Sequence, residues 1–311
     1  MVSIFLWLRA LFIRRRYVVS QALDEYAADF ALRGCRSMKS LRSEIATLKK
    51  RVGDLPVVDL TMSALREYQS LRHDDGVAAA TVNKEMAVLS AALQLAETNE
   101  RVASIPKFPR RLRPAAPRQG FLEDADYLAI RAELPDWGKP VLDFGWYSGW
   151  RRGEILGLTR EEVDLAVPEI RLHPDRSKNG ISRKLPLLDF GLEAIQVGLS
   201  TPGDTVFHLP NGQPISSTHW HQTWRAAVAA AGRPRVLFHD LRRSVVRRLE
   251  DNSVSRKTAM AWVGHKTESI YWRYCITTAR DLTRAAEKMI RSLRPQEGDR
   301  KIFRMFPPKK S

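Results

Sequence analysis

The sequence is poor in cysteine. Only two cysteines, Cys35 and Cys275, occur among 311 residues, far apart and in no CxxC pair. This excludes a disulfide framework and a four-cysteine structural zinc site. Reduced, partly buried thiols in a cytoplasmic protein are the simpler interpretation. A phosphate-binding P-loop and a cluster of acidic metal ligands are also missing, so the sequence predicts neither a cofactor nor a metal.

A hydrophobic run long enough to cross a bilayer is missing too. The apolar stretch at residues 2–13 is interrupted by Arg9 and followed by Arg14, Arg15 and Arg16, whereas a spanning helix needs about 20 apolar residues. A secretory signal would place its charges first and end in a small-residue cleavage site. We therefore expect residues 1–18 to be an N-terminal extension, either an amphipathic helix or the product of an upstream start codon. Membrane association is a lesser alternative.

Acidic residues are few relative to basic ones. Lysine and arginine number 51 against 35 aspartates and glutamates, which gives a net charge of +16 and a pI of about 10.2. Such a charge attracts polyanions, nucleic acid above all, although a generally basic protein would look the same. A hydrophobic content of 44% is ample for two domain cores in a chain of this length.

Residues 19–105 have the apolar periodicity of packed helices. One stripe ends before Gly53, a plausible helix stop, and consists of Met38, Leu41, Ile45, Leu48 and Val52. A second stripe runs from Val82 to Ala96, with Thr81 as the expected N-cap. Shorter patterns around Leu23 and Leu65 bring the number of expected helices to four.

Residues 106–119 differ in composition from their surroundings. Four prolines forbid a helix, and basic residues that include Arg110 and Arg111 have no acidic neighbours. We expect an extended linker that can lie along a phosphate backbone. A solvated connector without a ligand is the alternative.

Residues 120–295 form the second expected domain. Helical patterning to Arg151 gives way to a hairpin, with strands near 169–173 and 182–187 around a turn. Helices are expected again near 217–231, 239–249, 256–263 and 268–274. A last apolar face runs from Leu282 to Leu293 behind a capping-box pattern at Thr278 and Asp281, and could dock on its own domain or on a neighbouring protomer. Residues 296–311 form a basic tail.

Five polar segments follow one another along this second domain. They are Ser148–Glu154, Ser177–Gly180, His239–Arg242, Gly264–His265 and Tyr274. Together they contain what phosphodiester cleavage without a metal requires. Guanidinium groups stabilise the charged transition state, a phenol attacks phosphorus, and a lysine or histidine protonates the leaving oxygen. Each segment alone is a weak signal.

In order and spacing these segments resemble those of the tyrosine recombinases, or phage integrase family, from about Val19 to Leu293. The resemblance implies a mainly α protein, with an all-α, SAM-like core-binding domain at 19–105 and an α+β catalytic domain with a small antiparallel sheet at 120–295. It also assigns a role to each polar residue. Arg151 and Arg242 clamp the phosphate, His239 handles protons beside Arg242, His265 hydrogen-bonds the phosphate, Lys178 is the general acid and Tyr274 the nucleophile.

Three details of the motifs differ from the family pattern or have rivals. Ser148 stands where the family commonly has threonine, and keeps the hydroxyl. Lys184 is the nearest rival of Lys178, although a strand position would hold it less freely. Tyr271 is the rival of Tyr274, because residues three apart share a helical face. Glu154 is expected to orient Arg151 rather than to react.

The resemblance implies a site-specific recombinase that cuts and rejoins double-stranded DNA through a 3′-phosphotyrosine. The family acts as a homotetramer on paired DNA sites, so a tetramer and an accessory protein that bends DNA or sets direction are implied partners, in the cytoplasm at the nucleoid. The segments 149–154 and 237–243 favour a mobile-element integrase. The alternatives are a Xer-type dimer resolvase, a type IB topoisomerase and a non-catalytic DNA-binding relic.

Further DNA contacts are expected from the helix that carries Thr81. Asn83 and Lys84 lie off its apolar stripe, where they can reach a groove or a phosphate. A solvated helix face is the alternative.

Overall fold

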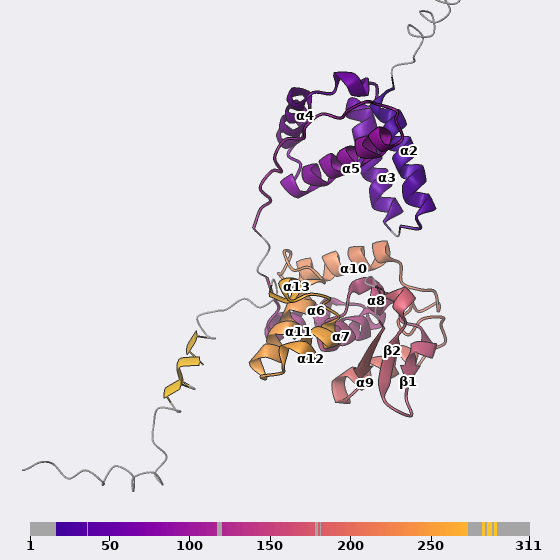
Figure 1. The fold of residues 1–311 in the computed structure, drawn as a ribbon. Coiled ribbons are helices and arrows are strands. Elements are labelled where there is room, and N and C mark those ends of the chain that lie inside the picture. The colour runs from indigo at the N-terminus through magenta and orange to yellow at the C-terminus, as the bar shows by residue number, and fades with distance from the viewer. Residues whose placement is uncertain are drawn as a thin grey trace, which may run out of the picture. The chain divides into compact units, whose positions relative to one another are not determined.

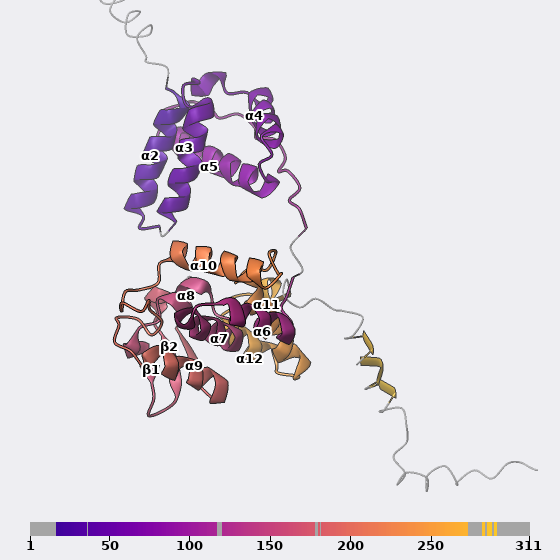
Figure 2. The ribbon, with the colours of Figure 1, turned by 180° about the vertical axis from the view of Figure 1, so that it is seen from behind.

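The computed structural model describes residues 17–35, 37–116, 120–177, 180, 182–272, 282, 283, 285–287, 289 and 290. These residues form two compact units, one before and one after positions 117–119 (Figures 1 and 2). Most of the described chain is helical, and the strands in it form one small antiparallel sheet. The predicted fold class is therefore confirmed.

In its described residues, the first unit contains four α-helices, as the apolar periodicity predicted. They are α2 (Val19–Leu32), α3 (Met38–Val52), α4 (Met62–Asp74) and α5 (Ala79–Thr98), with a short 3-10 turn, η1, at Val57–Asp59. The core buries the predicted stripe residues Leu41, Ile45 and Leu48, and Gly53 follows the last residue of α3. Helix α2 packs against both α3 and α5.

The start of α5 differs from the prediction. The helix begins at Ala79, after the N-cap Ala78, so Thr81 lies within its first turn and is not the cap. Alanine has the highest helix propensity, and the run Ala78–Ala80 extends the helix beyond the position where a threonine cap would start it.

The segment after α5 is packed on this unit along its first half. Residues 104–116 contain no helix or strand, and Phe108 and Leu112 pack against the helical core. The Asn83 side chain donates to the Leu112 carbonyl at 2.8 Å and accepts from the Leu112 backbone N–H at 2.9 Å. Gln69 donates to the carbonyl of Arg110. This holds the backbone in place, so the segment is an integral part of the unit up to Leu112.

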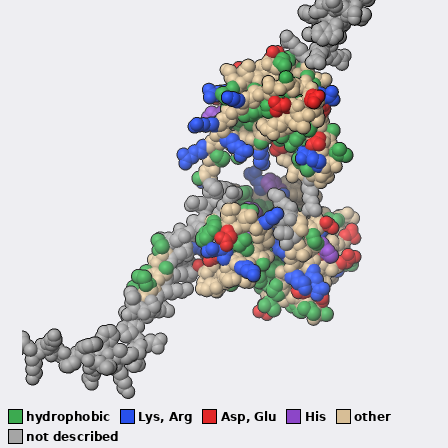
Figure 3. Space-filling view, in the orientation of Figure 1, with side chains coloured by type: hydrophobic (Ala, Val, Ile, Leu, Met, Phe, Trp, Pro, Cys, Tyr) green, Lys and Arg blue, Asp and Glu red, His purple; other side chains and the backbone are tan. Residues whose placement is uncertain are grey.

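The basic side chains of the same segment point to solvent. Lys107, Arg110, Arg111 and Arg113 are all exposed. Figure 3 shows lysine and arginine side chains gathered along the left edge of this unit, where α4 and the segment lie in Figure 1. The backbone is therefore fixed while the charges remain available to a ligand.

The second unit contains α6 to α13 around a buried central helix. The helices are α6 (Asp124–Glu133), α7 (Lys139–Ser148), α8 (Arg152–Leu156), α9 (Asp189–Leu199), α10 (Ser217–Ala230), α11 (Asp240–Asp251), α12 (Arg256–Val263) and α13 (Glu268–Trp272). Helix α7 packs on α9 and α11, and most of its residues are buried. Short 3-10 turns lie at Asp136–Gly138 (η2), Arg160–Glu162 (η3) and Pro174–Arg176 (η4). The end of α7 therefore delivers the segment Ser148–Glu154 to the centre of the unit.

The sheet has the order β1–β2–β3, with β1 at Val163–Asp164, β2 at Glu169–Leu172 and β3 at Arg183–Pro186. Strands β2 and β3 are the predicted hairpin, and their register pairs Leu172 with Arg183 and Ile170 with Leu185. Strand β1 and helix α9 were not predicted. The inward positions of β3 are Arg183 and Leu185, so one of the two core-facing residues of this strand carries a charge.

Several sequence predictions concern residues outside the described set. Residues 1–16, Thr278, Asp281 and the tail 296–311 are among them. Of the predicted apolar face, Leu282, Ala285, Ala286, Met289 and Ile290 are described, and all five side chains are exposed. No helix in the described part of the chain is long and apolar enough to cross a membrane.

Candidate active site

Two glycines end helices at the centre of the second unit. Gly149 follows α7 with φ +61°, and Gly264 follows α12 with φ +72°. Positive φ is strained for other residues, and glycine lets the chain turn sharply at a helix end. Each glycine lies in a segment that the sequence singled out. Arg151 lies two residues after Gly149, and His265 directly follows Gly264.

Arg242 and His265 meet in the interior. Arg242 is 1% exposed on α11, and its Nε donates to His265 Nε2 at 3.0 Å. Its Nη1 donates to the Gly149 carbonyl at 3.0 Å. One guanidinium thus contacts both glycine-ended loops, although Gly149, Arg242 and His265 are far apart in sequence. These contacts fix the orientation of the arginine, because guanidinium donors have a rigid, planar geometry.

His265 is a neutral histidine. Burial and the nearby guanidinium groups of Arg242 and Arg151 lower the pKa of its imidazole to about 3. Because Nε2 accepts from Arg242, the proton of the neutral ring is on Nδ1. The ring is therefore suited to holding a fixed hydrogen bond rather than to carrying a positive charge at neutral pH.

His239 lies at the N-cap of α11, three residues before Arg242. Unlike His265, its side chain is exposed at the surface. The ring is nevertheless partly enclosed by its neighbours, and this partial desolvation, together with the charges of Arg242 and Arg243, lowers the pKa of His239. The residue is therefore a neutral, accessible histidine beside a buried arginine.

Arg151 is held by the carboxylate of Glu154. Arg151 is the N-cap of α8, where its backbone N–H donates to Glu154 Oε2 at 3.0 Å and its Nη1 donates to Oε1 at 2.9 Å. Its Nη2 also donates to the Gly264 carbonyl at 3.3 Å. Burial alone raises the pKa of Glu154, but Arg183 and Arg151 hold that pKa below its usual value. Glu154 is therefore ionised and orients Arg151.

Arg183 is a second guanidinium on Glu154, and sequence reasoning missed it. Its Nη2 donates to Glu154 Oε2 at 2.7 Å and its Nη1 to the Val263 carbonyl at 2.6 Å. The guanidinium also lies 4.5 Å from the ring centre of Trp150. A signal was present in the sequence. The alternation of β3 places Arg183 on the same face as Leu185, where a charge needs a buried partner.

The structure thus brings Arg151, Arg242 and His265 together, with His239 three residues before Arg242 on the same helix. Lys178 and Tyr274 lie outside the described residues. The rival lysine, Lys184, is exposed and forms an ion pair with Glu169 at 3.4 Å. The rival tyrosine, Tyr271, is 0% exposed and donates its hydroxyl to Glu250 at 2.6 Å. Its ring also packs edge-on against His265, so Tyr271 is a core residue in this structure.

The structure distinguishes among the four residues of the first unit that the sequence predicts to contact DNA. Lys84, Arg110 and Arg111 are exposed. The amide of Asn83, in contrast, is engaged with the Leu112 backbone, which is a sufficient structural role for it. Contact of any of these four residues with DNA stays a prediction.

Two hollows border the arginine–histidine cluster. The larger, about 790 Å³, is lined by Arg151, Arg152, Arg225, Arg235 and His239 together with the edges of Trp220 and Trp224. The smaller, about 240 Å³, lies between His265, Arg183 and the hairpin residues Ser177 and Ser182. The lining of both is rich in cations, and within the described chain no group of His, Cys, Asp and Glu could hold a metal ion. The surroundings are suited to an anion.

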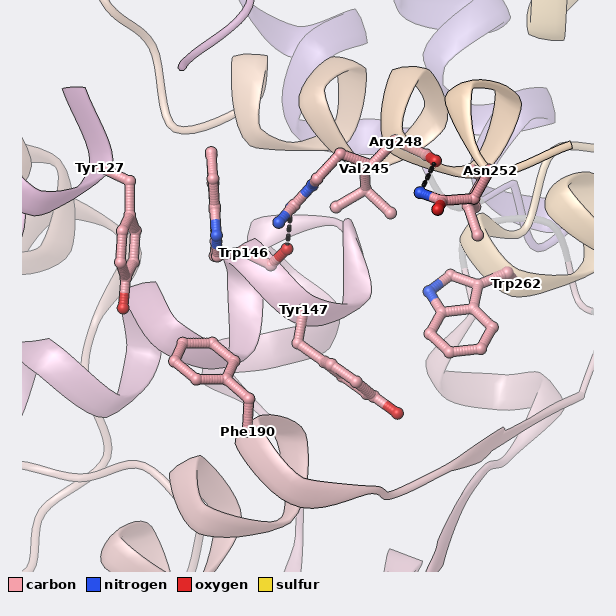
Figure 4. Close-up of a pocket in the computed structure, with 9 residues that line it drawn as sticks. Tyr127, Trp146, Tyr147, Phe190, Val245, Arg248, Asn252 and Trp262 are labelled. Atoms are coloured by element: carbon pink, nitrogen blue, oxygen red, sulfur yellow. Dashed lines mark hydrogen bonds between the residues drawn. The ribbon is translucent and has the colours of Figure 1, made fainter. Parts of the chain in front are cut away.

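A third hollow, about 500 Å³, has an apolar character (Figure 4). Tyr127, Trp146, Phe190 and Trp262 surround it, and Arg248 lies 3.9 Å from the Trp146 ring centre. Burial lowers the pKa of Arg248 to about 10. The lining residues are different from those of the cation-rich hollows, so this cavity is not part of the candidate site.

Comparison with known proteins agrees with this geometry. The sequence profile described as "Phage integrase family" matches residues 121–280. The integrase of Escherichia phage HK022 is 24% identical over 271 residues, which are 81% of this chain and 74% of that protein. A lambda integrase dimer bound to a COC′ core site superposes with a TM-score of 0.72 at 21% identity, covering 87% of this chain and 81% of that one. A lambda integrase tetramer bound to a Holliday junction gives 0.69 at 21% identity, covering 84% and 78%.

The helical unit, the small sheet and the buried arginine–histidine cluster define a mainly α protein with a cation-rich site that is suited to an anion such as a phosphate. The profile match spans half of the chain, and the chain therefore belongs to the phage integrase family. As a member of this family it is a tyrosine-type site-specific DNA recombinase.

Proposed function

We propose that this recombinase is the integrase of a mobile element, and that Tyr274 is its nucleophile. The observation that carries the proposal is the buried contact of Arg242 with His265 and with the loop that leads to Arg151. The curated relatives from phages HK022, 434, lambda and P22 are all named integrase, which favours an integrase over a dimer resolvase.

In the proposed reaction, the hydroxyl of Tyr274 attacks the scissile phosphorus and the bond to the 5′ oxygen breaks. Arg151 and Arg242 donate to the non-bridging oxygens, which gain negative charge in the transition state. His265, neutral and held by Arg242, donates one further hydrogen bond to a phosphate oxygen from its remaining ring N–H. The neutral His239 takes up the proton that the Tyr274 hydroxyl loses. Lys178 gives a proton to the departing 5′ oxygen. The 3′-phosphotyrosine keeps the bond energy, so a 5′-hydroxyl of a partner duplex can reverse the step.

Assembly is part of the proposal. The neighbours that support it are lambda integrase as a dimer on a core site and as a tetramer on a Holliday junction. We infer a homotetramer on paired duplex sites, acting where its DNA is, in the cytoplasm at the nucleoid. A DNA-bending or directionality protein is the expected accessory partner.

The direct test is covalent trapping by the full-length protein. A nicked suicide duplex that carries the junction sequence flanking the gene should yield a denaturant-resistant protein–DNA band, with the phosphate on Tyr274 by mass spectrometry. Tyr274→Phe should abolish the band because it lacks the attacking oxygen.

Tyr271→Phe is the matched control. Its hydroxyl donates to Glu250 in a partly buried hydrogen bond, so losing it should cost about 1 kcal/mol of stability and leave the covalent band. Loss of the band in Tyr271→Phe alone would assign the nucleophile to Tyr271 instead. Plasmid relaxation without any sequence preference would favour the topoisomerase alternative, and no adduct from the wild type would favour a DNA-binding relic.

A further inference from the structure

Two arginines and one carboxylate form a closed network between α8 and the end of α12. Glu154 Oε1 accepts from Arg151, whose second nitrogen donates to the Gly264 carbonyl. Glu154 Oε2 accepts from Arg183, whose other nitrogen donates to the Val263 carbonyl. The two guanidinium groups therefore bind the same carboxylate and two consecutive carbonyls, directly before His265.

Arg183 is tightly enclosed in this network. Its side chain is 7% exposed, against 23% for Arg151. A Cβ on Gly264 would lie 1.8 Å from Arg183 Nη1, so the guanidinium fills the space that the glycine leaves. Arg183 therefore cannot reach a DNA phosphate without leaving its partners, whereas Arg151 is partly open. Whatever Arg183 contributes acts through its neighbours.

The charges of the network indicate what that contribution is. A lone Glu154–Arg151 pair would be neutral, and a neutral pair has little attraction for a phosphate. With Arg183 bound to the second carboxylate oxygen, the two guanidinium groups and one carboxylate sum to one positive charge. In a buried site this one unit of positive charge attracts a phosphate more strongly than it would in water, because the dielectric constant of the surroundings is lower.

We propose that Arg183 is a positioning residue for strand cleavage: it shares the Glu154 carboxylate, so that Arg151 keeps its charge for the phosphate, and it ties the His265 loop to α8. This role rests on the proposed function. It also links β3, the strand that follows Lys178 in the sequence, to the loop that carries His265. Strand β3, Arg151 and the loop of His265 are then held together by one set of hydrogen bonds.

The test is a charge-balance rescue in the full-length protein. Arg183→Met leaves the Glu154–Arg151 pair neutral, and single-turnover cleavage of the suicide duplex at saturating DNA should slow about 10- to 100-fold, the usual cost of losing a residue that orients a catalytic group. DNA affinity should change little, because Arg183 does not reach the DNA. The double variant Glu154→Gln/Arg183→Met restores one positive charge, and should recover about tenfold in rate over Arg183→Met.

Two further variants complete the design. Arg183→Lys keeps the charge but reaches one partner at a time. Its cleavage rate should lie between those of Arg183→Met and the wild type. Arg171→Met removes an arginine of the same sheet whose side chain is 54% exposed and paired with Glu169, and should cleave at the wild-type rate. Tryptophan fluorescence during denaturation shows that each variant is folded.

The outcomes separate this inference from the function on which it rests. No adduct from the wild type overturns both. An adduct from the wild type, absent in Tyr274→Phe and formed equally fast by Arg183→Met, overturns only the role of Arg183. If the double variant is as slow as Arg183→Met although both are folded, Arg183 acts as packing alone and the charge-sharing role is wrong.

Discussion

Single residues set the charge state of the active centre. His265 is buried against Arg242, and its pKa falls from the ordinary 6.5 to about 3 because burial and the arginine charges disfavour the imidazolium. In the unfolded chain these effects are absent. The unfolded state therefore binds a proton at a pH where the folded state does not, and acid draws the equilibrium towards unfolding.

The consequence is a pH dependence of stability with a defined sign. The free energy of unfolding should be unaffected by His265 above pH 6.5. Below it, stability should fall by up to about 1.4 kcal/mol per pH unit, until the folded pKa near 3 is reached. His265→Gln cannot titrate, so its stability should decline less between pH 6.5 and 4.5 than that of the wild type. Urea unfolding followed by tryptophan fluorescence measures this.

The positions of the tryptophans determine which unit the fluorescence reports on. Of its eight tryptophans, Trp7 lies outside the described residues and the other seven are in residues 120–272. Tryptophan fluorescence therefore reports mainly on the unit that contains His265. His73→Gln, in the helical unit, should leave the pH profile unchanged. Parallel profiles for wild type and His265→Gln would contradict a neutral buried imidazole.

At the scale of elements, the site is built where helices stop. Gly149 ends α7 with positive φ, and an added Cβ would lie 2.9 Å from the Cβ of Val245 on α11. The turn therefore requires glycine both for its conformation and for the close approach of two helices. The same approach lets Arg242 of α11 reach the Gly149 carbonyl.

Gly149→Ala should destabilise the second unit through both effects. Left-handed strain costs about 1–2 kcal/mol, and overpacking against Val245 adds about 1–3 kcal/mol. Gly232→Ala is the matched control, because Gly232 has a similar φ of +70° with nothing within 4 Å of an added Cβ. Its cost should be the strain alone. Equal shifts of the urea midpoint in the two variants would show that the α7–α11 approach accommodates a methyl group.

At the scale of the whole molecule, the excess of positive charge dominates. A net charge of +16 predicts DNA binding that weakens steeply with salt, since neutralised phosphates release counterions. The exposed Arg110, Arg111 and Arg113 of the helical unit are available for this, on a stretch of backbone that Asn83 and Gln69 hold by hydrogen bonds to Leu112 and Arg110.

Lys84→Ala tests one of these contacts. If the exposed Lys84 meets a phosphate, the substitution should lower affinity and reduce the slope of log K against log salt by about 1. Lys49→Ala is the control, since Lys49 is already paired with Asp24 at 2.6 Å. Fluorescence anisotropy over a salt series measures both slopes. An unchanged slope in Lys84→Ala would remove this residue from the interface.

Local sequence determined much of the fold because helices and hairpins depend on nearby residues. The sequence was enough to predict the apolar stripe of α3 and its end at Gly53, the β2–β3 hairpin and the order of the polar segments. Helix α9 was not, because Gly191 and Gly198 weaken its helical signal. Those glycines are needed elsewhere: added Cβ atoms would lie 2.5 Å from the Tyr147 ring and 2.8 Å from the Val206 carbonyl oxygen.

Only the tertiary structure decided how the polar groups are paired. The sequence by itself determined which side chains are present and in what order, since composition and spacing are properties of the chain. It could not show that Arg183 binds Glu154, 29 residues earlier, and a carbonyl 80 residues later. Nor could it show that the side-chain oxygen of Asn83 accepts a hydrogen bond from the backbone N–H of Leu112. A buried charge must find its partner in space, and that partner is fixed by how the elements pack.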